Sequence, residues 1–262
     1  MRRYWRLFFL QLRMSLTVGA AYRWDFLLQG GLSLVWTVLG VVPLYVALRG
    51  RPPVEGWGFE QALVVVGWFT MLKGVLDGAV NPSLTAVVEH IRKGTLDFVL
   101  MKPADAQFLV STAKFELWKV VDLFAGVGIV VWAFALMKTA PDPFAIALSV
   151  LLLAVAIAVL YSIWICAIAM AFWVVRLDNL SYLFNSLIDF GRWPVSIFRG
   201  FVRLFFTLVI PIALMTTYPA EALLGRLSVR TAVLGILGSM AFALLGRLVW
   251  TRALGRYTSA SS

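Results

Sequence analysis

The sequence predicts an all-α integral membrane protein with six transmembrane helices. Hydrophobic residues make up 61% of the 262 residues and charged residues only 14%, whereas an average globular protein carries about 25% charged residues. A domain of this size could not bury so much apolar surface away from water, so lipid must solvate much of it. Several apolar stretches also reach the roughly 20 residues that a helix needs to cross a hydrocarbon core about 30 Å thick.

Residues 1–262 are interpreted as a single transmembrane domain with six spans. The fourth apolar run is too long for one perpendicular crossing and too short for two, which predicts a tilted or projecting helix. The fifth span contains Pro211, which predicts a kink that either lines a transport pathway or is an ordinary bend. The predicted spans are residues 26–48, 61–80, 120–137, 144–175, 202–218 and 231–250.

The distribution of Lys and Arg predicts the orientation of the spans. If the N-terminus is cytoplasmic, the inside segments carry 17 of these residues and the outside segments carry 5. Cytoplasmic loops of membrane proteins are enriched in Lys and Arg. The sequence therefore predicts that both termini are cytoplasmic.

Residues 1–24 predict a basic amphipathic helix that lies in the headgroup plane of the membrane. Arg2, Arg6 and Arg13 fall on one helical face and apolar side chains on the other, a pattern that suits binding to anionic membrane lipids. A cleaved signal peptide is disfavoured because Gln11 and Arg13 interrupt the apolar stretch. A disordered basic tail is the alternative.

A second amphipathic helix is predicted at residues 82–94, after the second span. Asn81 suits the N-cap, Pro82 the first helical position and Gly94 the left-handed position that ends a helix. Arg92 and Lys93 in the last turn complement the helix dipole. Apolar residues at helical spacing form one stripe: Leu84, Val87, Val88 and Ile91. This helix either docks a cytoplasmic partner or rests on the membrane or its own bundle.

Charged residues in or beside the spans predict ion pairs. Lys73 and Asp77 lie four residues apart in the second span, on one helical face. Charges in a span are costly and usually face the bundle interior or a water-filled path. The two residues are therefore either a neutralising pair or a relay for protons or substrate. Glu116 and Lys119, before the third span, are also expected to pair.

The sequence excludes several classes of function. One cysteine, Cys166, forms no internal disulfide, and one histidine, His90, builds no multi-ligand zinc site. The chain shows no nucleophile–base set, no paired catalytic carboxylates, no phosphate-binding loop and no metal or cofactor site. The orientation rule explains the basic residues, so no nucleic-acid partner is predicted.

Three stretches carry a resemblance to a known family. They are Ile91–Asp97 with Leu100 and Lys102-Pro103, then Phe190–Pro194 with Ile197-Phe198, then Ile210-Pro211 with Tyr218–Ala220 and Leu223–Gly225. In this order and with six spans, the chain resembles the permease subunits of type 2 ABC exporters. It is similar in particular to a bacterial six-span family of mostly unassigned substrate.

The resemblance implies an interfacial elbow helix at residues 1–24 and a coupling helix at 82–94 that docks on a cytoplasmic ATPase. It also implies short re-entrant elements on the outer side, around Tyr218–Gly225. The ATPase, with its ATP and magnesium, would be a separate chain, because this sequence has no phosphate loop. The residues implied in ATPase coupling are Leu84, Val87, Val88, Glu89, Ile91, Arg92, Lys93, Gly94 and Asp97.

The implied function is the non-catalytic permease subunit of an ABC exporter in the bacterial inner membrane. The permease would pair with a second copy or a related permease, and move a substrate from the cytoplasm or inner leaflet outward. A secondary transporter is one alternative, and it would show an internal repeat with broken helices in both halves. A membrane scaffold without a transport cycle is the other.

Overall fold

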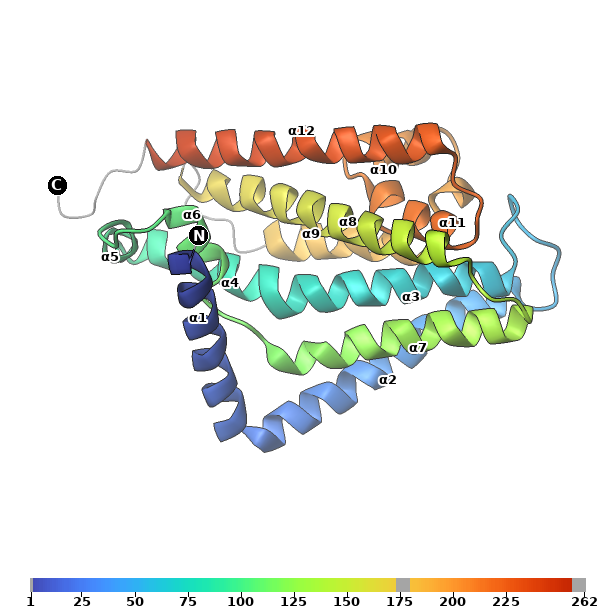
Figure 1. The fold of residues 1–262 in the computed structure, drawn as a ribbon, viewed down its shortest axis with the longest axis horizontal. Coiled ribbons are helices and arrows are strands. Elements are labelled where there is room, and N and C mark those ends of the chain that lie inside the picture. The colour runs from blue at the N-terminus through green and yellow to red at the C-terminus, as the bar shows by residue number, and fades with distance from the viewer. Residues whose placement is uncertain (1, 173–179, 256–262) are drawn as a thin grey trace.

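Long helices run roughly side by side in this computed structural model, and the N-terminal helix crosses them steeply (Figure 1). Residues 2–172 and 180–255 are described. The described helices are α1 (Arg2–Ala21), α2 (Arg23–Leu48), α3 (Phe59–Val75), α4 (Asn81–Arg92), α5 (Asp97–Leu100), α6 (Ala106–Ser111), α7 (Val120–Met137), α8 (Pro143–Ala169), α9 (Leu180–Ile188), α10 (Gly200–Leu208), α11 (Tyr218–Leu223) and α12 (Val229–Leu254).

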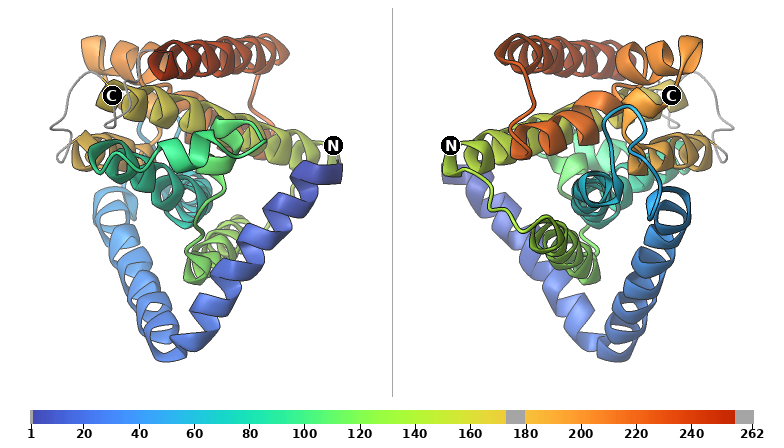
Figure 2. Two further views of the ribbon diagram at one scale, coloured as in Figure 1. Left: turned by 90° about the vertical axis from the view of Figure 1, so that its left-hand side faces the viewer. Right: turned by 90° about the vertical axis from the view of Figure 1, so that its right-hand side faces the viewer.

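The bundle has two ends that differ in structure (Figure 1). The α4 end holds α4, α5 and α6, and the loop end holds the connection at residues 49–58. Viewed along the bundle, α1 and α2 form the two arms of a V, with α7 between them (Figure 2).

Five helical segments are long and apolar enough to cross a membrane within the described part of the chain. They are α2, α3 with its continuation α4, the helix from Leu117 to Met137, α8 and α12. The spans predicted at 26–48, 61–80, 120–137 and 231–250 are therefore confirmed as helices. The fourth span is helical from Pro143 to Ala169 and ends in a 3₁₀ turn, and residues 173–175 of the prediction lie outside the described residues.

The predicted fifth span at 202–218 is not one helix in the structure. These residues form a pair of helices bent by 70°, Gly200–Leu208 and Ala213–Leu223. Arg199, just before the pair, lies at the loop end, with its Nη2 3.9 Å from Glu55 Oε1. Arg226, just after the pair, donates from Nη1 to the Gly56 carbonyl at 3.0 Å. Both ends of the pair therefore lie at the loop end, so it enters the bundle and returns.

The stretch from Leu180 to Arg199 carries the chain between the two ends. Near its start, Phe184 packs edge-on against Trp164 in the last turns of α8. The stretch continues through the 3₁₀ turns Asp189–Arg192 and Val195–Ile197 to Arg199 at the loop end. Asp189 and Arg192, expected in a cytoplasmic loop, lie instead along the length of the bundle.

Helix α3, with its continuation α4, is the centre of the fold. In its most apolar 18-residue stretch 72% of the residues are buried, whereas in that of α2 only 17% are. It packs most closely on α7, where Gly67 and Gly126 face each other. A Cβ added at Gly126 would lie 2.6 Å from the Gly67 carbonyl oxygen and 2.5 Å from Met71 Cγ. Small residues allow such close helix approach in membrane proteins. The α3–α7 pair is therefore the tightest contact in the described bundle.

Candidate functional site

Helix α4 continues directly from α3 through a π-helical turn, Leu76–Val80. The prediction that Asn81 begins a separate helix as an N-cap is therefore wrong, since Asn81 has helical φ −62° and ψ −47°. Its side-chain oxygen accepts a hydrogen bond from Trp164 Nε1 at 3.2 Å instead. Pro82 leaves a carbonyl without its usual helical donor, and the Gly78 carbonyl accepts from the Glu116 N–H at 2.7 Å.

The apolar stripe of α4 faces the chain's own bundle. Leu84 and Val87 are fully buried, and Val88 and Ile91 pack partly buried on the same core. This stripe is therefore filled by the protein itself and leaves only the opposite face for another molecule. The exposed residues of that face are Thr85, Glu89, Arg92 and Lys93. Lys93 Nζ lies 3.3 Å from Glu89 Oε2, and both side chains are about two-thirds exposed.

The C-terminal end of α4 has the predicted left-handed cap. Gly94 has φ +66°, a backbone conformation that residues other than glycine adopt at a cost. The Thr95 N–H donates to the His90 carbonyl at 2.9 Å and the Gly94 N–H to the Ile91 carbonyl at 3.3 Å. This pair of bonds is the Schellman arrangement. It directs the chain into α5, where Asp97 is half-buried and the neighbouring Phe98 is 65% exposed.

The segment after α5 is fixed to both the first and the last helix. Arg247 of α12 binds Asp105 through two hydrogen bonds of 2.7 and 3.2 Å and Gln107 through one of 2.6 Å. The hydrogen bonds from Arg247 lower the pKa of the Asp105 carboxyl below its ordinary value. On the α1 side, Gln11 donates to the Leu109 carbonyl at 3.3 Å. The α4 end is thereby a single connected block.

A network of charges lies beside the π-helical turn. Lys73 Nζ is 3.7 Å from Asp77 Oδ2, so the predicted pair is formed. Asp77 is also 3.6 Å from Lys119 Nζ, which lies 3.0 Å from Asp122 Oδ2. Asp122, only 5% exposed, accepts a further hydrogen bond from Ser33. The two carboxylates thus share Lys119, which joins α3, α7 and α2.

The expected pairing of Glu116 with Lys119 is wrong. Glu116 Oε1 lies 2.7 Å from Lys114 Nζ, and Lys119 instead lies over the Trp118 ring, 4.4 Å from its centroid. Lys119 has one acidic residue three positions before it and another three positions after it, so spacing alone allowed it to pair with Glu116 or with Asp122. Lys119 turns inward toward the buried Asp122 of α7 and the partly exposed Asp77 of the π-helical turn.

Residues of the crossing stretch join this network from the other side. Lys73 donates to Asn185 Oδ1 at 2.6 Å and lies 4.0 Å from Asp189 Oδ1. Arg192 Nη2 lies 3.7 Å from the same Asp189 oxygen, and its guanidinium carbon lies 5.1 Å from the Phe69 ring centroid. Sequence reasoning missed Asp189 and Arg192 because both were assigned to a loop. The one available signal was their place in and beside the Phe190–Pro194 motif.

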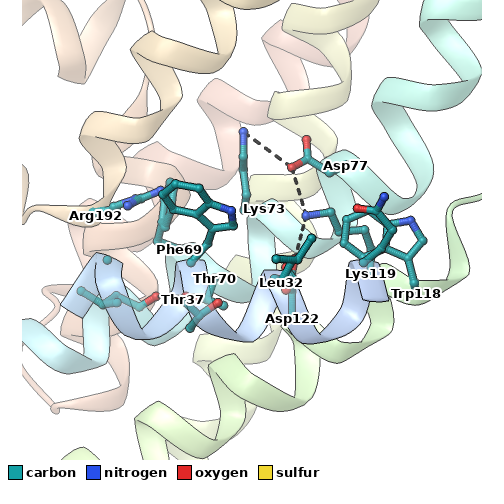
Figure 3. Close-up of a pocket in the computed structure, with 15 residues that line it drawn as sticks. Leu32, Thr37, Phe69, Thr70, Lys73, Asp77, Trp118, Lys119, Asp122 and Arg192 are labelled. Atoms are coloured by element: carbon teal, nitrogen blue, oxygen red, sulfur yellow. Dashed lines mark hydrogen bonds and ion pairs between the residues drawn. The ribbon is translucent and has the colours of Figure 1, made fainter. Parts of the chain in front are cut away.

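A cavity of about 360 Å³ lies beside this network, lined by residues of α2, α3 and the start of α7 together with Asp77, Lys119 and Arg192 (Figure 3). Arg192 and Phe69 lie at one side of it, Lys119 and Trp118 at the other, and Lys73 between them. The hydroxyl groups of Ser33, Thr37 and Thr70 add polar lining from α2 and α3. The volume is within the range of ligand pockets.

Pro211 lies in the break between α10 and a second π-helical turn, Ala213–Thr217. Its carbonyl accepts from the Met215 N–H at 3.1 Å. The predicted kink is therefore present, but it is the bend between the two helices of the re-entrant pair and not a bend within a span. It lies away from the charged cavity, whose lining does not include Pro211.

Comparison with known proteins identifies the family. No curated protein and no solved structure matches the chain. The family described as ABC-2 family transporter protein matches residues 34–261, which include every described helix from α3 to α12. The motif resemblance, the apolar helices and this match agree, and the chain belongs to the ABC-2 transporter family as a membrane permease of an ABC transporter.

Proposed function

We propose that the chain is the permease subunit of an ABC exporter, driven by a separate cytoplasmic ATPase that docks on the exposed face of α4. The observation that carries this proposal is the unbroken helical path from α4 through the π turn into α3. A force on α4 reaches the most buried helix of the bundle without crossing a flexible loop. Coupling through packed, two-state helical elements is the usual route in such switches.

The docking surface consists of the exposed polar face of α4 and the adjoining α5. Glu89, Arg92 and Lys93 would meet the ATPase, and the exposed Phe98 and Met101 of the next segment would add an apolar contact. Leu84, Val87, Val88 and Ile91 would act by fixing α4 to the bundle. Gly94 and Asp97 would shape the turn between the two parts of the surface.

The proposed orientation places the α4 end and both termini in the cytoplasm. Arg192 lies within the crossing stretch, and Arg199 and Arg203 belong to the loop end or the re-entrant pair. With these reassigned, the described residues on the α4 side still carry 12 Lys and Arg against 7 on the loop side. The asymmetry therefore supports the same orientation, in a bacterial inner membrane crossed several times.

A second permease copy, identical or related, would complete the transporter. Helix α2 leaves many large apolar side chains exposed, including Leu27, Trp36 and Val46, and α12 does the same with Leu234 and Leu244. Lipid or a partner subunit covers such faces. ATP and magnesium would bind the partner ATPases, and the permease itself would perform no chemistry.

Charge reversal on α4 tests the docking surface. We expect the double substitution Arg92→Glu and Lys93→Glu to release a co-purifying cytoplasmic ATPase during affinity purification, while membrane insertion is retained. The matched control is Arg49→Glu with Arg51→Glu, two exposed residues at the loop end. Equal ATPase recovery from both double variants would contradict docking at α4.

Cysteine labelling tests the orientation separately. In a Cys166→Ser background, cysteine at the exposed Arg51 should react with a membrane-impermeant maleimide in intact cells. Cysteine at the exposed Lys102 should react only after the membrane is opened. Labelling of Lys102→Cys in intact cells would reverse the proposed topology.

A further inference from the structure

The strongest unexplained feature of the molecule is the guanidinium of Arg192 in the charged cavity. Its nearest carboxylate oxygen is 3.7 Å away, on Asp189, and its Nε is buried without a hydrogen-bond partner in the described part of the chain. The other two cations of the cavity are better satisfied. Lys119 lies 3.0 Å from Asp122, and Lys73 donates to Asn185 at 2.6 Å.

The Arg192 side chain is 39% exposed, but its Nε is buried. The residue belongs to the stretch that crosses between the two ends of the bundle, where charged side chains are expensive and usually mark a ligand or ion path. Gly40 of α2 allows the side chain to reach the cavity, because a Cβ there would lie 3.0 Å from Arg192 Nη1. The guanidinium also lies over Phe69, which holds it in place beside the open space.

The charges around the cavity indicate an anionic ligand group on the Arg192 side. On the far side, Asp77 and Asp122 share Lys119, and Asp77 also pairs with Lys73. Within the described ranges, the carboxylate contact of Arg192 is the long one to Asp189, so its side of the cavity keeps unused donors. A guanidinium presents paired N–H donors that match the oxygens of a phosphate.

The rim of the cavity indicates that the rest of the ligand is apolar. Leu32 and Trp36, on the α2 wall, are 52% and 69% exposed on the outer surface of the helix. About 360 Å³ is at the small end of ligand pockets, enough for a headgroup but not for attached hydrocarbon chains. The chains would therefore lie outside, along Leu32 and Trp36.

We propose that this cavity binds the phosphate-bearing headgroup of an amphiphile such as a phospholipid, with Arg192 holding the phosphate. Thr37 and Thr70 supply hydroxyl groups beside it. The apolar part of the ligand lies against α2. The site is contained within one chain, so binding does not depend on the partner ATPase or on the direction of transport.

Lipid binding to the purified full chain tests the proposal without any transport assay. The probes are phosphatidylglycerol and diacylglycerol with the same acyl chains, titrated in neutral detergent and followed by native mass spectrometry. We expect the wild-type chain to bind phosphatidylglycerol at least tenfold more tightly than diacylglycerol. Soluble glycerol phosphate should compete only at far higher concentration, because it lacks the apolar part.

Substitutions locate the phosphate contact. Arg192→Gln should weaken phosphatidylglycerol binding roughly 10- to 100-fold, as expected for loss of a charged hydrogen bond. Arg192→Lys, which keeps the charge but not the paired donors, should show an intermediate loss. The matched control is Arg199→Gln at the loop end, which should bind as the wild type does.

Three results would overturn the proposal, and two of them need no variant. They are equal binding of diacylglycerol and phosphatidylglycerol by the wild type, glycerol phosphate binding as tightly as the lipid, and equal losses for Arg192→Gln and Arg199→Gln. If Arg192→Gln does not fold, Arg192→Lys with wild-type affinity is the equivalent negative result. Failure of α4 to bind an ATPase would leave all of these measurements unchanged.

Discussion

Replacing Lys119 with methionine tests whether the buried charge network stabilises the bundle. The side chain is 14% exposed and its Nζ lies 3.0 Å from Asp122 Oδ2 and 3.6 Å from Asp77 Oδ2. Methionine keeps the length of the chain but leaves both carboxylates without their shared cation. Removing one partner of a buried ion pair costs about 3–5 kcal/mol. Asp122 keeps Ser33 and Asp77 keeps Lys73, so we expect about 3 kcal/mol.

The measurement is the free energy of unfolding in mixed detergent micelles, followed by helical circular dichroism. The control is Lys114→Met, which removes the ion pair with Glu116. That pair is shorter, at 2.7 Å, but Lys114 is 60% exposed, and exposed pairs contribute at most about 1 kcal/mol. Adding Asp122→Asn to Lys119→Met should recover part of the loss. Equal losses from Lys114→Met and Lys119→Met would refute the argument from burial.

Two further substitutions probe helix packing and pH dependence. Gly126→Leu should destabilise the bundle by several kcal/mol, about the cost of overpacking, because its Cβ would lie 2.5 Å from Met71 Cγ. The control is Gly128→Leu, whose Cβ would have nothing within 4 Å, and it should be neutral in the same unfolding assay. Arg247 lowers the pKa of Asp105, so this contact stabilises the fold above the ordinary carboxyl pKa and is lost as pH falls through the lowered one. Asp105→Asn should therefore cost stability at pH 7 and progressively less as the pH falls below the ordinary carboxyl pKa, and a cost that does not change with pH would contradict the assignment.

The lengths of the apolar stretches predict most spans of this chain correctly, because each of these spans lies in one continuous helix. The third predicted span, 120–137, coincides with α7, and the first and sixth differ from α2 and α12 by a few residues at their ends. Lipid solvates most of these helices directly, so local composition determines their length. The same reasoning fails for 202–218, because the chain bends within this stretch. Residues 210–217 are buried in the bundle, whereas Val202, Leu204 and Leu208 before the bend are exposed.

Contacts between residues distant in sequence explain the remaining errors. The contact of Arg199 with Glu55 places the start of the re-entrant pair, and no local pattern indicates it. The continuation of α3 into α4 depends on the Glu116 N–H, which bonds the carbonyl that Pro82 leaves without a helical donor. Without that partner, the Asn-Pro sequence favours a helix start.

The charged cavity was predictable only in part. Lys73 and Asp77 are one helical turn apart, so their pairing follows from spacing alone. Lys119 and Arg192 reach the same cavity from other elements, and their contribution depends on the tertiary packing. Arg192, which hydropathy assigns to a loop, therefore lines the site only because of the tertiary fold.

The backbone contact between Gly67 and Gly126 divides the molecule into a static and a mobile part. The Gly67 carbonyl lies against Gly126, with the side chains of Met71 and Val130 packed closely around it, so we expect α3 and α7 to move together as one rigid unit. Any opening of a path for the substrate would have to come from movement of α2 and α12, which are much less buried, against the α3–α7 pair. A cross-link from α3 to α7 should therefore spare turnover, whereas one from α2 to α3 should arrest it.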